Sequence, residues 1–234
     1  MRRMAMKPFV FILIIINLFF YLPAEAAADK DFPYDSVISN PSLKLGVDFK
    51  INISNEQLKF LLKNLDLTCD LIRFLDLDRF EAKKLESGFY RAKDQAGLEG
   101  YIYEKKITGD TIIFGGEGTY TDRRLPTTIS GRVVLVTAVR ITSHATRQLK
   151  NTIYIQLKSN LLHYTTRLFS PIIRRVIMGK TENLKNVARK SIKKMNKQNK
   201  EIHRKLTNRD DKRAGDWKII FIDSEGSKID FSKY

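Results

Sequence analysis

The residue types that most often carry out chemistry are sparse in this sequence, and none recurs at the spacing of a reactive site. The three histidines, His144, His163 and His203, are far apart and have no histidine or cysteine neighbour at a metal-ligand spacing. Each is interpreted as structural, although His163 could face a cavity. Cys69, the single cysteine, cannot form an internal disulfide and is interpreted as a small buried apolar residue. We therefore predict no metal and no cofactor.

The remaining polar motifs do not point to an active site either. Asp76 and Asp78 would point the same way only in an extended chain, so a solvent-facing loop is preferred over an acid–base pair. The run Gly115–Gly118 lacks the Lys-Ser/Thr of a phosphate-binding loop and lies within a strand pattern. It is interpreted as a place where a sheet curves, or where a ligand approaches the backbone. No catalytic residue is predicted.

Apolar side chains alternate with polar ones along much of the chain, which predicts seven strands. The first spans 44–53, and turn signals at 86–88 and 108–110 divide the later alternating region into hairpins. The six later strands are predicted at 80–85, 89–93, 98–107, 111–121, 132–142 and 151–158, with a polar connection at 144–150. They form an antiparallel meander. Its interior face is predicted to carry Val133, Leu135, Thr137, Val139 and Ile141.

Helical periodicity appears in two places. After the first strand, Ser54 is a natural N-cap for a short helix, and a second short helix is predicted at 66–77. Pro171 is predicted to begin a long helix whose apolar stripe runs from Ile173 to Met195. Beyond Asn199 the stripe fades. Residues 200–216 are therefore predicted as a fraying basic linker, and 217–222 with 227–231 as a small terminal hairpin.

The first residues have the anatomy of a secretory signal peptide. Basic residues precede an apolar run from Phe9 to Leu22, and small residues follow up to Ala28. The apolar run is shorter than the ~20 residues that a bilayer span needs. We expect cleavage to leave a mature chain that starts at Ala27 or Asp29 and is periplasmic or secreted. An uncleaved N-terminal membrane anchor is the alternative.

The charge of the chain is high and unevenly placed. The net charge is +16, and thirteen lysines and arginines lie between Lys180 and Arg213, against four acidic residues. Such a block attracts polyanions, either nucleic acid or the anionic head groups of a membrane. Export disfavours nucleic acid and favours the membrane, whereas the alternative is a solvated face kept soluble by charge. The predicted contact residues are Lys193, Lys194, Lys197, Lys200, Arg204 and Lys205.

The order of these elements resembles the helix-grip fold of the START-related lipid-transfer and polyketide-cyclase superfamily. The resemblance covers about residues 40–197 and includes the helix 54–65 after a lone strand and the closing amphipathic helix. It implies an α+β fold in which a curved seven-stranded antiparallel sheet wraps around a long C-terminal helix. The chain then divides into a signal peptide (1–28), a START-like domain (29–199), and a basic linker with a short hairpin (200–234).

In this fold the gap between sheet and helix is usually a pocket with an apolar and aromatic lining. We therefore expect an exported START-like module that binds a hydrophobic small molecule, a lipid in the first instance, near a membrane and without catalysis. One alternative is a cyclase or aromatase enzyme, which would bury the polar atoms of Tyr101, Tyr120 and His163 around an open pocket. The other is an interaction protein with a filled core and a basic docking face. The oligomeric state is left open. The predicted cavity lining is Phe114, Tyr120, Val133, Leu135, Val139, Ile153, Ile155, Ile173 and Ile177.

Overall fold

The computed structural model of the protein describes residues 32–77, 80–94, 98–120, 129–143, 146–158 and 189–223. The predicted signal peptide, the first part of the predicted long helix and the second strand of the predicted terminal hairpin lie outside the described residues. So do Ile173, Ile177 and His163, and the side chain of Tyr120 is not described.

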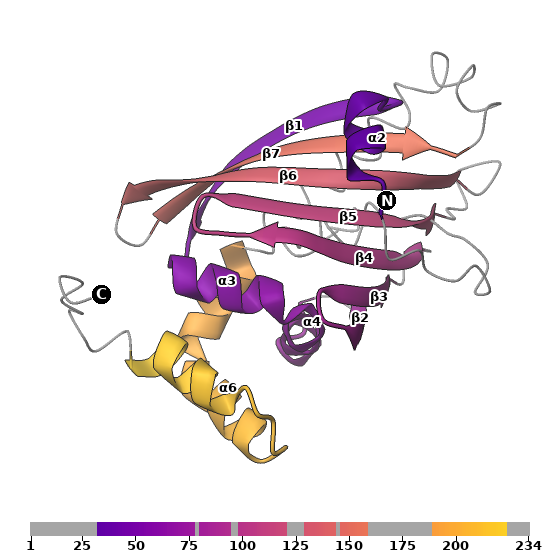
Figure 1. The fold of residues 1–234 in the computed structure, drawn as a ribbon. Helices are drawn as coiled ribbons and strands as arrows, with labels where there is room; N and C mark the ends of the chain where they lie inside the picture. The colour runs from indigo at the N-terminus through magenta and orange to yellow at the C-terminus, as the bar shows by residue number, and fades with distance from the viewer. Residues whose placement is uncertain are drawn as a thin grey trace, which may run out of the picture.

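Seven strands form one antiparallel sheet in the order β1-β7-β6-β5-β4-β3-β2 (Figure 1). The strands are β1 (Leu43–Asn52), β2 (Glu81–Glu86), β3 (Phe89–Lys93), β4 (Leu98–Ile107), β5 (Thr111–Tyr120), β6 (Ile129–Ser143) and β7 (Thr146–Leu157). The predicted meander is confirmed, because each strand from β2 to β7 pairs with the next one along the chain. The lone first strand, β1, lies at one edge of the sheet and pairs with β7.

β6 and β7 are longer than predicted. β7 begins at Thr146, inside the predicted polar connection, because the side chains of Arg147 and Leu149 continue the buried face of the strand. The prediction for Ile141 was wrong, since this residue is 66% exposed. It lies near the end of β6, beside the register shift between Ile141 and Ser143, whereas Val133, Leu135, Thr137 and Val139 are buried as predicted.

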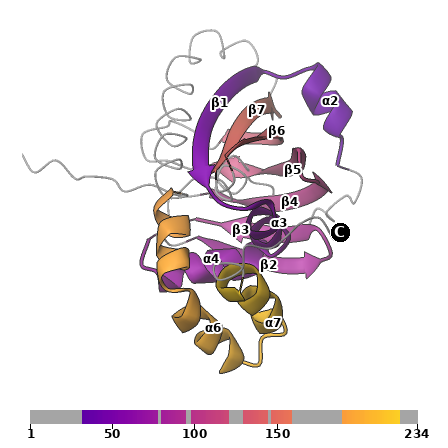
Figure 2. The ribbon, with the colours of Figure 1, turned by 90° about the vertical axis from the view of Figure 1, so that its left-hand side faces the viewer.

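The two short helices after β1 are α3 (Asn55–Lys63) and α4 (Leu65–Phe74). Ser54 caps α3 as predicted: its Oγ accepts the backbone N–H of Gln57 at 3.1 Å, and its own N–H donates to Gln57 Oε1 at 3.1 Å. α4 was predicted to end at residue 77 but ends at Phe74. Shortly after it, Asp76 takes a left-handed backbone conformation with φ of 49°. Both helices lie against one side of the sheet, here called the inner face (Figure 2).

The C-terminal region is helical, so the predicted linker at 200–216 and the predicted first hairpin strand at 217–222 are wrong. After helical residues 189–197 come α6 (Asn199–Thr207), α7 (Ala214–Trp217) and a π-helical turn η1 (Lys218–Asp223). Trp217 and Phe221 are both fully buried, four residues apart, whereas Ile219 between them is 65% exposed. A spacing of four residues puts Trp217 and Phe221 on one side of a helix. In a strand Ile219 would lie on the same face as these two residues and would be buried with them.

A short helix that the sequence did not reveal, α2 (Tyr34–Ser39), covers the opposite, outer face of the sheet. A second apolar cluster lies beneath it, made of Phe32, Val37, Tyr103 and Val134. Gly115 provides the space for this cluster, because a Cβ atom at that position would lie 2.5 Å from the ring of Phe32. The close approach at Gly115 is therefore made by the protein's own Phe32 ring, which the two interpretations of the run 115–118, sheet curvature and ligand approach, did not include.

Candidate functional site

The inner face of the sheet is largely apolar. The register places the side chains of neighbouring strands side by side, because Phe114 of β5 pairs with Leu135 of β6, and Leu135 pairs with Ile153 of β7. Six of the residues predicted to line a cavity are buried here in one cluster: Phe114, Val133, Leu135, Val139, Ile153 and Ile155. That they contact a ligand stays a prediction.

The cluster continues into the helices. Leu61 of α3, Ile72 of α4 and Met195 of the helical residues 189–197 belong to it, and all are at most 2% exposed. Among the described elements, α3 contacts α4, β4 and η1, and α4 packs on β2. The six predicted residues lie on β5 to β7, further along the sheet (Figure 1).

One polar pair, Thr137 and Asn151, interrupts this apolar face. The two residues are paired across β6 and β7, and both are almost fully buried. Thr137 Oγ1 lies 2.8 Å from Asn151 Oδ1, and Asn151 Nδ2 donates to the carbonyl oxygens of Val47 at 2.8 Å and Leu149 at 3.3 Å. Thr137 was predicted for the interior, whereas Asn151 was not. Its signal would have been a polar residue at a position where the alternation of β7 requires an apolar one.

The buried arginine of β7 ties the end of the sheet to the first helix. Arg147 is 6% exposed, and its Nε donates to Asn55 Oδ1 at 2.7 Å, at the first residue of α3. Its Nη1 donates to the carbonyl oxygen of Ser143 at 2.9 Å. The charge is thus compensated by hydrogen bonds at the edge of the inner face, which is the usual condition for burying a guanidinium group.

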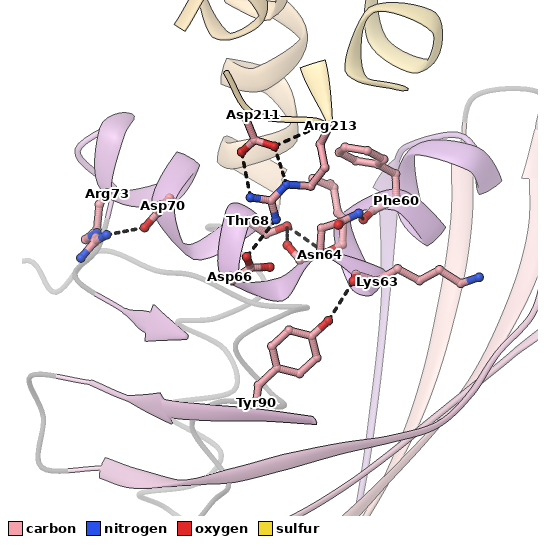
Figure 3. A network of polar contacts seen from close by, with 11 residues as sticks. Phe60, Lys63, Asn64, Asp66, Thr68, Asp70, Arg73, Tyr90, Asp211 and Arg213 are labelled. Atoms are coloured by element: carbon pink, nitrogen blue, oxygen red, sulfur yellow. Dashed lines mark hydrogen bonds and ion pairs between the residues drawn. The ribbon is translucent and has the colours of Figure 1, made fainter. Parts of the chain in front are cut away.

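The junction of α3 and α4 is held by polar contacts from three parts of the chain (Figure 3). The hydroxyl group of Tyr90 donates to the carbonyl oxygen of Lys63 at 2.8 Å. Arg213, from the C-terminal region, donates to Asp66 Oδ2 at 2.9 Å and contacts Asp211 through two nitrogens, each at 2.8 Å. These contacts explain why residues that the sequence assigned to a linker are ordered against α4.

Two titratable groups near this junction, the Tyr90 hydroxyl and the Cys69 thiol, are kept in their neutral forms by burial. Desolvation raises the pKa of the Tyr90 hydroxyl and of the Cys69 thiol well above their ordinary values. Cys69 is fully buried, so its interpretation as a small apolar residue is confirmed. A thiol held neutral in this way is a poor nucleophile.

Of the three residues named for enzyme chemistry, Tyr101 alone has a described side chain, and it does not lie on the inner face. Tyr101 lies on the outer face and stacks on Phe89, with ring centroids 5.5 Å apart. His203 is a half-buried residue of α6. Among the described residues, no three histidine, cysteine or acidic side chains lie close enough to hold a metal ion.

The outer face carries a charged cluster that the sequence analysis did not single out. Glu117 is 8% exposed, and its carboxylate accepts the hydroxyl of Tyr103 at 3.1 Å. Arg132 Nε lies 3.4 Å and Lys158 Nζ 3.2 Å from Glu117 Oε2. The only hint in the sequence was a carboxylate within the glycine run, at a position where β5 alternates toward the outer side.

The predicted basic surface divides into two groups. Lys193, Lys197, Lys200 and Arg204 are exposed within residues 189–207. Lys194 and Lys205 instead make contacts within the domain: Lys194 Nζ donates to the carbonyl oxygen of Leu75 at 2.8 Å, and Lys205 Nζ lies 3.4 Å from the ring centroid of Phe74. None of the described helices has the length and apolar character needed to cross a bilayer.

Comparison with known proteins gives distant structural neighbours. No protein-family model matches the sequence, and no curated protein is significantly similar to it. A conserved protein from Geobacillus kaustophilus is 12% identical, over 65% of this chain and 97% of its own, with a TM-score of 0.45. Truncated norcoclaurine synthase from Thalictrum flavum is 10% identical, over 62% and 91%, with a TM-score of 0.41. Ara h 8.0201 is 11% identical, over 59% and 97%, with a TM-score of 0.35.

Likenesses this distant carry no functional information, so the function has to be argued from the residues of the site.

Proposed function

We propose that this domain binds a hydrophobic small molecule of the lipid class against the inner face of its sheet, and that it does so outside the cytoplasm, at a membrane surface, without catalysis. The observation that carries the proposal is the apolar surface that β5, β6 and β7 build from in-register side chains. A ligand bound there would gain ~25 cal/mol for each Å² of apolar surface removed from water, before entropic costs.

The polar groups described near this face support binding rather than catalysis. Thr137 and Asn151 bond each other and the backbone, so these contacts are already used in holding β1, β6 and β7 together. Tyr90 donates its hydroxyl to a backbone carbonyl, and Tyr101 lies on the other face. A cyclase-type enzyme needs a polar group aimed at its substrate. None of these four residues meets that requirement.

The test is to identify what the purified protein carries. Native mass spectrometry, followed by organic extraction, is expected to find a hydrophobic molecule bound in a one-to-one ratio. A matched pair of variants places that molecule: Val133→Phe enlarges a buried residue of the inner face, and Val136→Phe enlarges a half-buried residue of the outer face. Val133→Phe should abolish copurification with little loss of stability, and Val136→Phe should retain the ligand.

A filled core would give the opposite pattern. Val133→Phe would then overpack the sheet and cost about 1–3 kcal/mol of unfolding free energy, and no hydrophobic molecule would be extracted from the wild-type protein. That outcome overturns the proposal in favour of an interaction protein. A polar product that appears on incubation with an extracted ligand would instead favour the enzyme.

The membrane part of the proposal rests on the exposed cations of residues 189–207. Lys193, Lys197, Lys200 and Arg204 form part of the exposed side of the helical segment, whose buried residues include Ile202. Each cation contributes ~1 kcal/mol when it lies near an anionic bilayer. Docking through this side would leave the buried contacts of the C-terminal helices intact.

Vesicle cosedimentation tests the membrane contact. Replacing the four cations by glutamine should strongly weaken binding to vesicles with anionic lipid at 0.1 M salt. Wild-type binding should also fade by 1 M salt, as the Debye length shrinks from ~10 Å to ~3 Å. The matched control replaces four exposed cations elsewhere, Lys50, Lys83, Lys106 and Arg140. Equal losses in both variants would mean that net charge, and not this surface, drives the binding.

Export is tested separately by N-terminal sequencing of the protein from its native host. A start at Ala27 or Asp29 is expected. An intact Met1 in the membrane fraction would favour the anchored alternative.

A further inference from the structure

The charged cluster around Glu117 occupies two neighbouring rows of side chains on the outer face. In one row the register pairs Glu117 of β5 with Arg132 of β6, and in the next it pairs Thr119 with Ser130. The backbone N–H of Lys158, directly after β7, donates to the carbonyl oxygen of Ser130 at 3.0 Å and so extends the second row. Because residues two apart along a strand share a face, these polar residues all lie on the outer side of the sheet.

The carboxylate of Glu117 holds two cations side by side. Arg132 Nε and Lys158 Nζ lie 3.4 Å and 3.2 Å from the same oxygen, Oε2, while Oε1 accepts the hydroxyl of Tyr103 at 3.1 Å. Glu117 is only 8% exposed, so its carboxylate is fixed in position. Because both nitrogen atoms contact one oxygen atom, the two cations are close enough to contact one small anion together.

Both cations are only partly satisfied by this carboxylate. The two contacts are longer than the about 2.7–2.9 Å of a tight charge-assisted hydrogen bond, and one negative charge faces two positive ones. Glu99, which the register places beside Thr119, already accepts Arg91 Nε at 3.1 Å. Among the described residues Arg132 donates through Nε alone, so its two Nη groups are left for another acceptor. The side chains of Arg132 and Lys158 are 33% and 27% exposed, so a ligand can reach them from solvent.

A buried hydroxyl group lies beside these cations and also lacks an acceptor. Thr119 is 1% exposed, and its Oγ1 forms no hydrogen bond with any residue that the structure describes. Burying a hydroxyl group without a partner costs free energy, so such groups in native proteins usually have one. An anion held by Arg132 and Lys158 would supply an acceptor next to this hydroxyl.

We propose that this cluster binds a phosphate group, with Arg132 and Lys158 as its charged donors and the hydroxyl of Thr119 as a third donor. A guanidinium group matches the geometry of phosphate through paired N–H groups, and an ammonium group adds a point charge. Glu117 keeps the two cations in place and does not itself contact the phosphate. The site does not depend on the proposed function of the inner face, because it lies on the opposite side of the sheet. The phosphate group belongs either to a soluble compound or to a lipid head group, and the test separates these two sources.

The probe is inorganic phosphate, titrated into the purified protein at constant ionic strength and followed by amide NMR. Phosphate should bind saturably, and Arg132→Gln and Lys158→Gln should each weaken it about fivefold through loss of a charged donor. Thr119→Val keeps the shape of the side chain and should weaken phosphate about threefold without lowering the melting temperature, because it removes a hydroxyl group that has no partner. The matched control is Arg140→Gln, which changes an exposed arginine on the same face of β6 and should leave the phosphate affinity unchanged. The dispersed amide spectrum of each variant verifies that it is folded.

Vesicles that contain phosphatidic acid identify the source of the phosphate group. If it belongs to a lipid, Arg132→Gln should lower cosedimentation with these vesicles and Arg140→Gln should not. If it belongs to a soluble compound, both variants should cosediment like the wild type, although Arg132→Gln still loses affinity for inorganic phosphate. The proposal is overturned if phosphate fails to saturate the wild-type protein, or if Thr119→Val binds it unchanged. Equal losses in Arg132→Gln and Arg140→Gln would also overturn it, because net charge alone would then explain the binding.

Discussion

Trp217 decides whether the C-terminal helices are part of the domain core. Its side chain is fully buried, its ring stacks on Phe221 with centroids 3.9 Å apart, and both rings meet Phe60 of α3 edge-on at 6.0 Å. Its indole N–H donates to the carbonyl oxygen of Asn199 at 3.1 Å. These contacts join the C-terminal region to a helix that lies early in the sequence.

Trp217→Ala should lower the free energy of unfolding by about 3–5 kcal/mol, the usual cost of deleting a large aromatic side chain from a core. For a domain of this size each kcal/mol shifts the melting temperature by about 2–4 °C, so a decrease of about 6–20 °C is expected. Trp217→Phe keeps a ring in the stack and loses the hydrogen bond, which should cost about 1 kcal/mol. The matched control, Ile219→Ala, changes an exposed neighbour and should stay within about 0.5 kcal/mol.

The assay is urea denaturation followed by two signals. Trp217 is the single tryptophan, so wild-type fluorescence reports the C-terminal helices alone, while far-UV circular dichroism reports the whole fold. The two transitions should coincide. A fluorescence transition at lower urea, or a wild-type midpoint for Trp217→Ala, would refute the reasoning. If residues 200–216 were only a linker, truncation after Asn199 would leave the domain folded. That result would also refute the reasoning.

Three further changes test local features of the fold. Gly115→Ala should cost about 1–3 kcal/mol, because its Cβ would clash with a ring, whereas Gly46→Ala, with nothing within 4 Å, should be tolerated; equal melting temperatures would contradict this packing. Arg213→Met should destabilise the domain at pH 7. Arg213 lowers the folded-state pKa of Asp211, so this contribution exists above the ordinary carboxyl pKa and disappears as the pH falls through the lowered one. The difference from wild type in urea should therefore shrink below about pH 4, and a constant gap would argue against the ion pair. Ser54→Ala should cost about 1 kcal/mol in the same assay through loss of the α3 cap, and an unchanged midpoint would show that the cap is dispensable.

The sheet could be predicted from the sequence because its strands and turns are marked by patterns of neighbouring residues. Alternation marks the strands β1 to β5 to within one residue at each end, and turn residues such as Gly88, with φ of 70°, mark the hairpins. The same alternation identified the inner face, including Phe114 and Leu135, since register and period together decide which side of a sheet a residue occupies.

The elements that were missed depend on distant partners. α2 is six residues long, and its place is set by Phe32 entering the space above Gly115, some eighty residues away. α6 looks like a charged linker because its buried residues, such as Ile202 and Leu206, are few among lysines. No pattern of neighbouring residues indicates that Arg213 forms a hydrogen bond with Asp66.

The docking of the C-terminal helices also sets the order in which the protein can be completed. Asp66 and Arg213 are 147 residues apart in the chain. At ~5–20 residues per second, a ribosome needs about 7 to 30 s to synthesise that interval. Throughout this time the nascent chain contains α3 and α4 without the aromatic residues that cover them. The growing polypeptide therefore carries this apolar surface of α3 uncovered until residues 213–221 have been made.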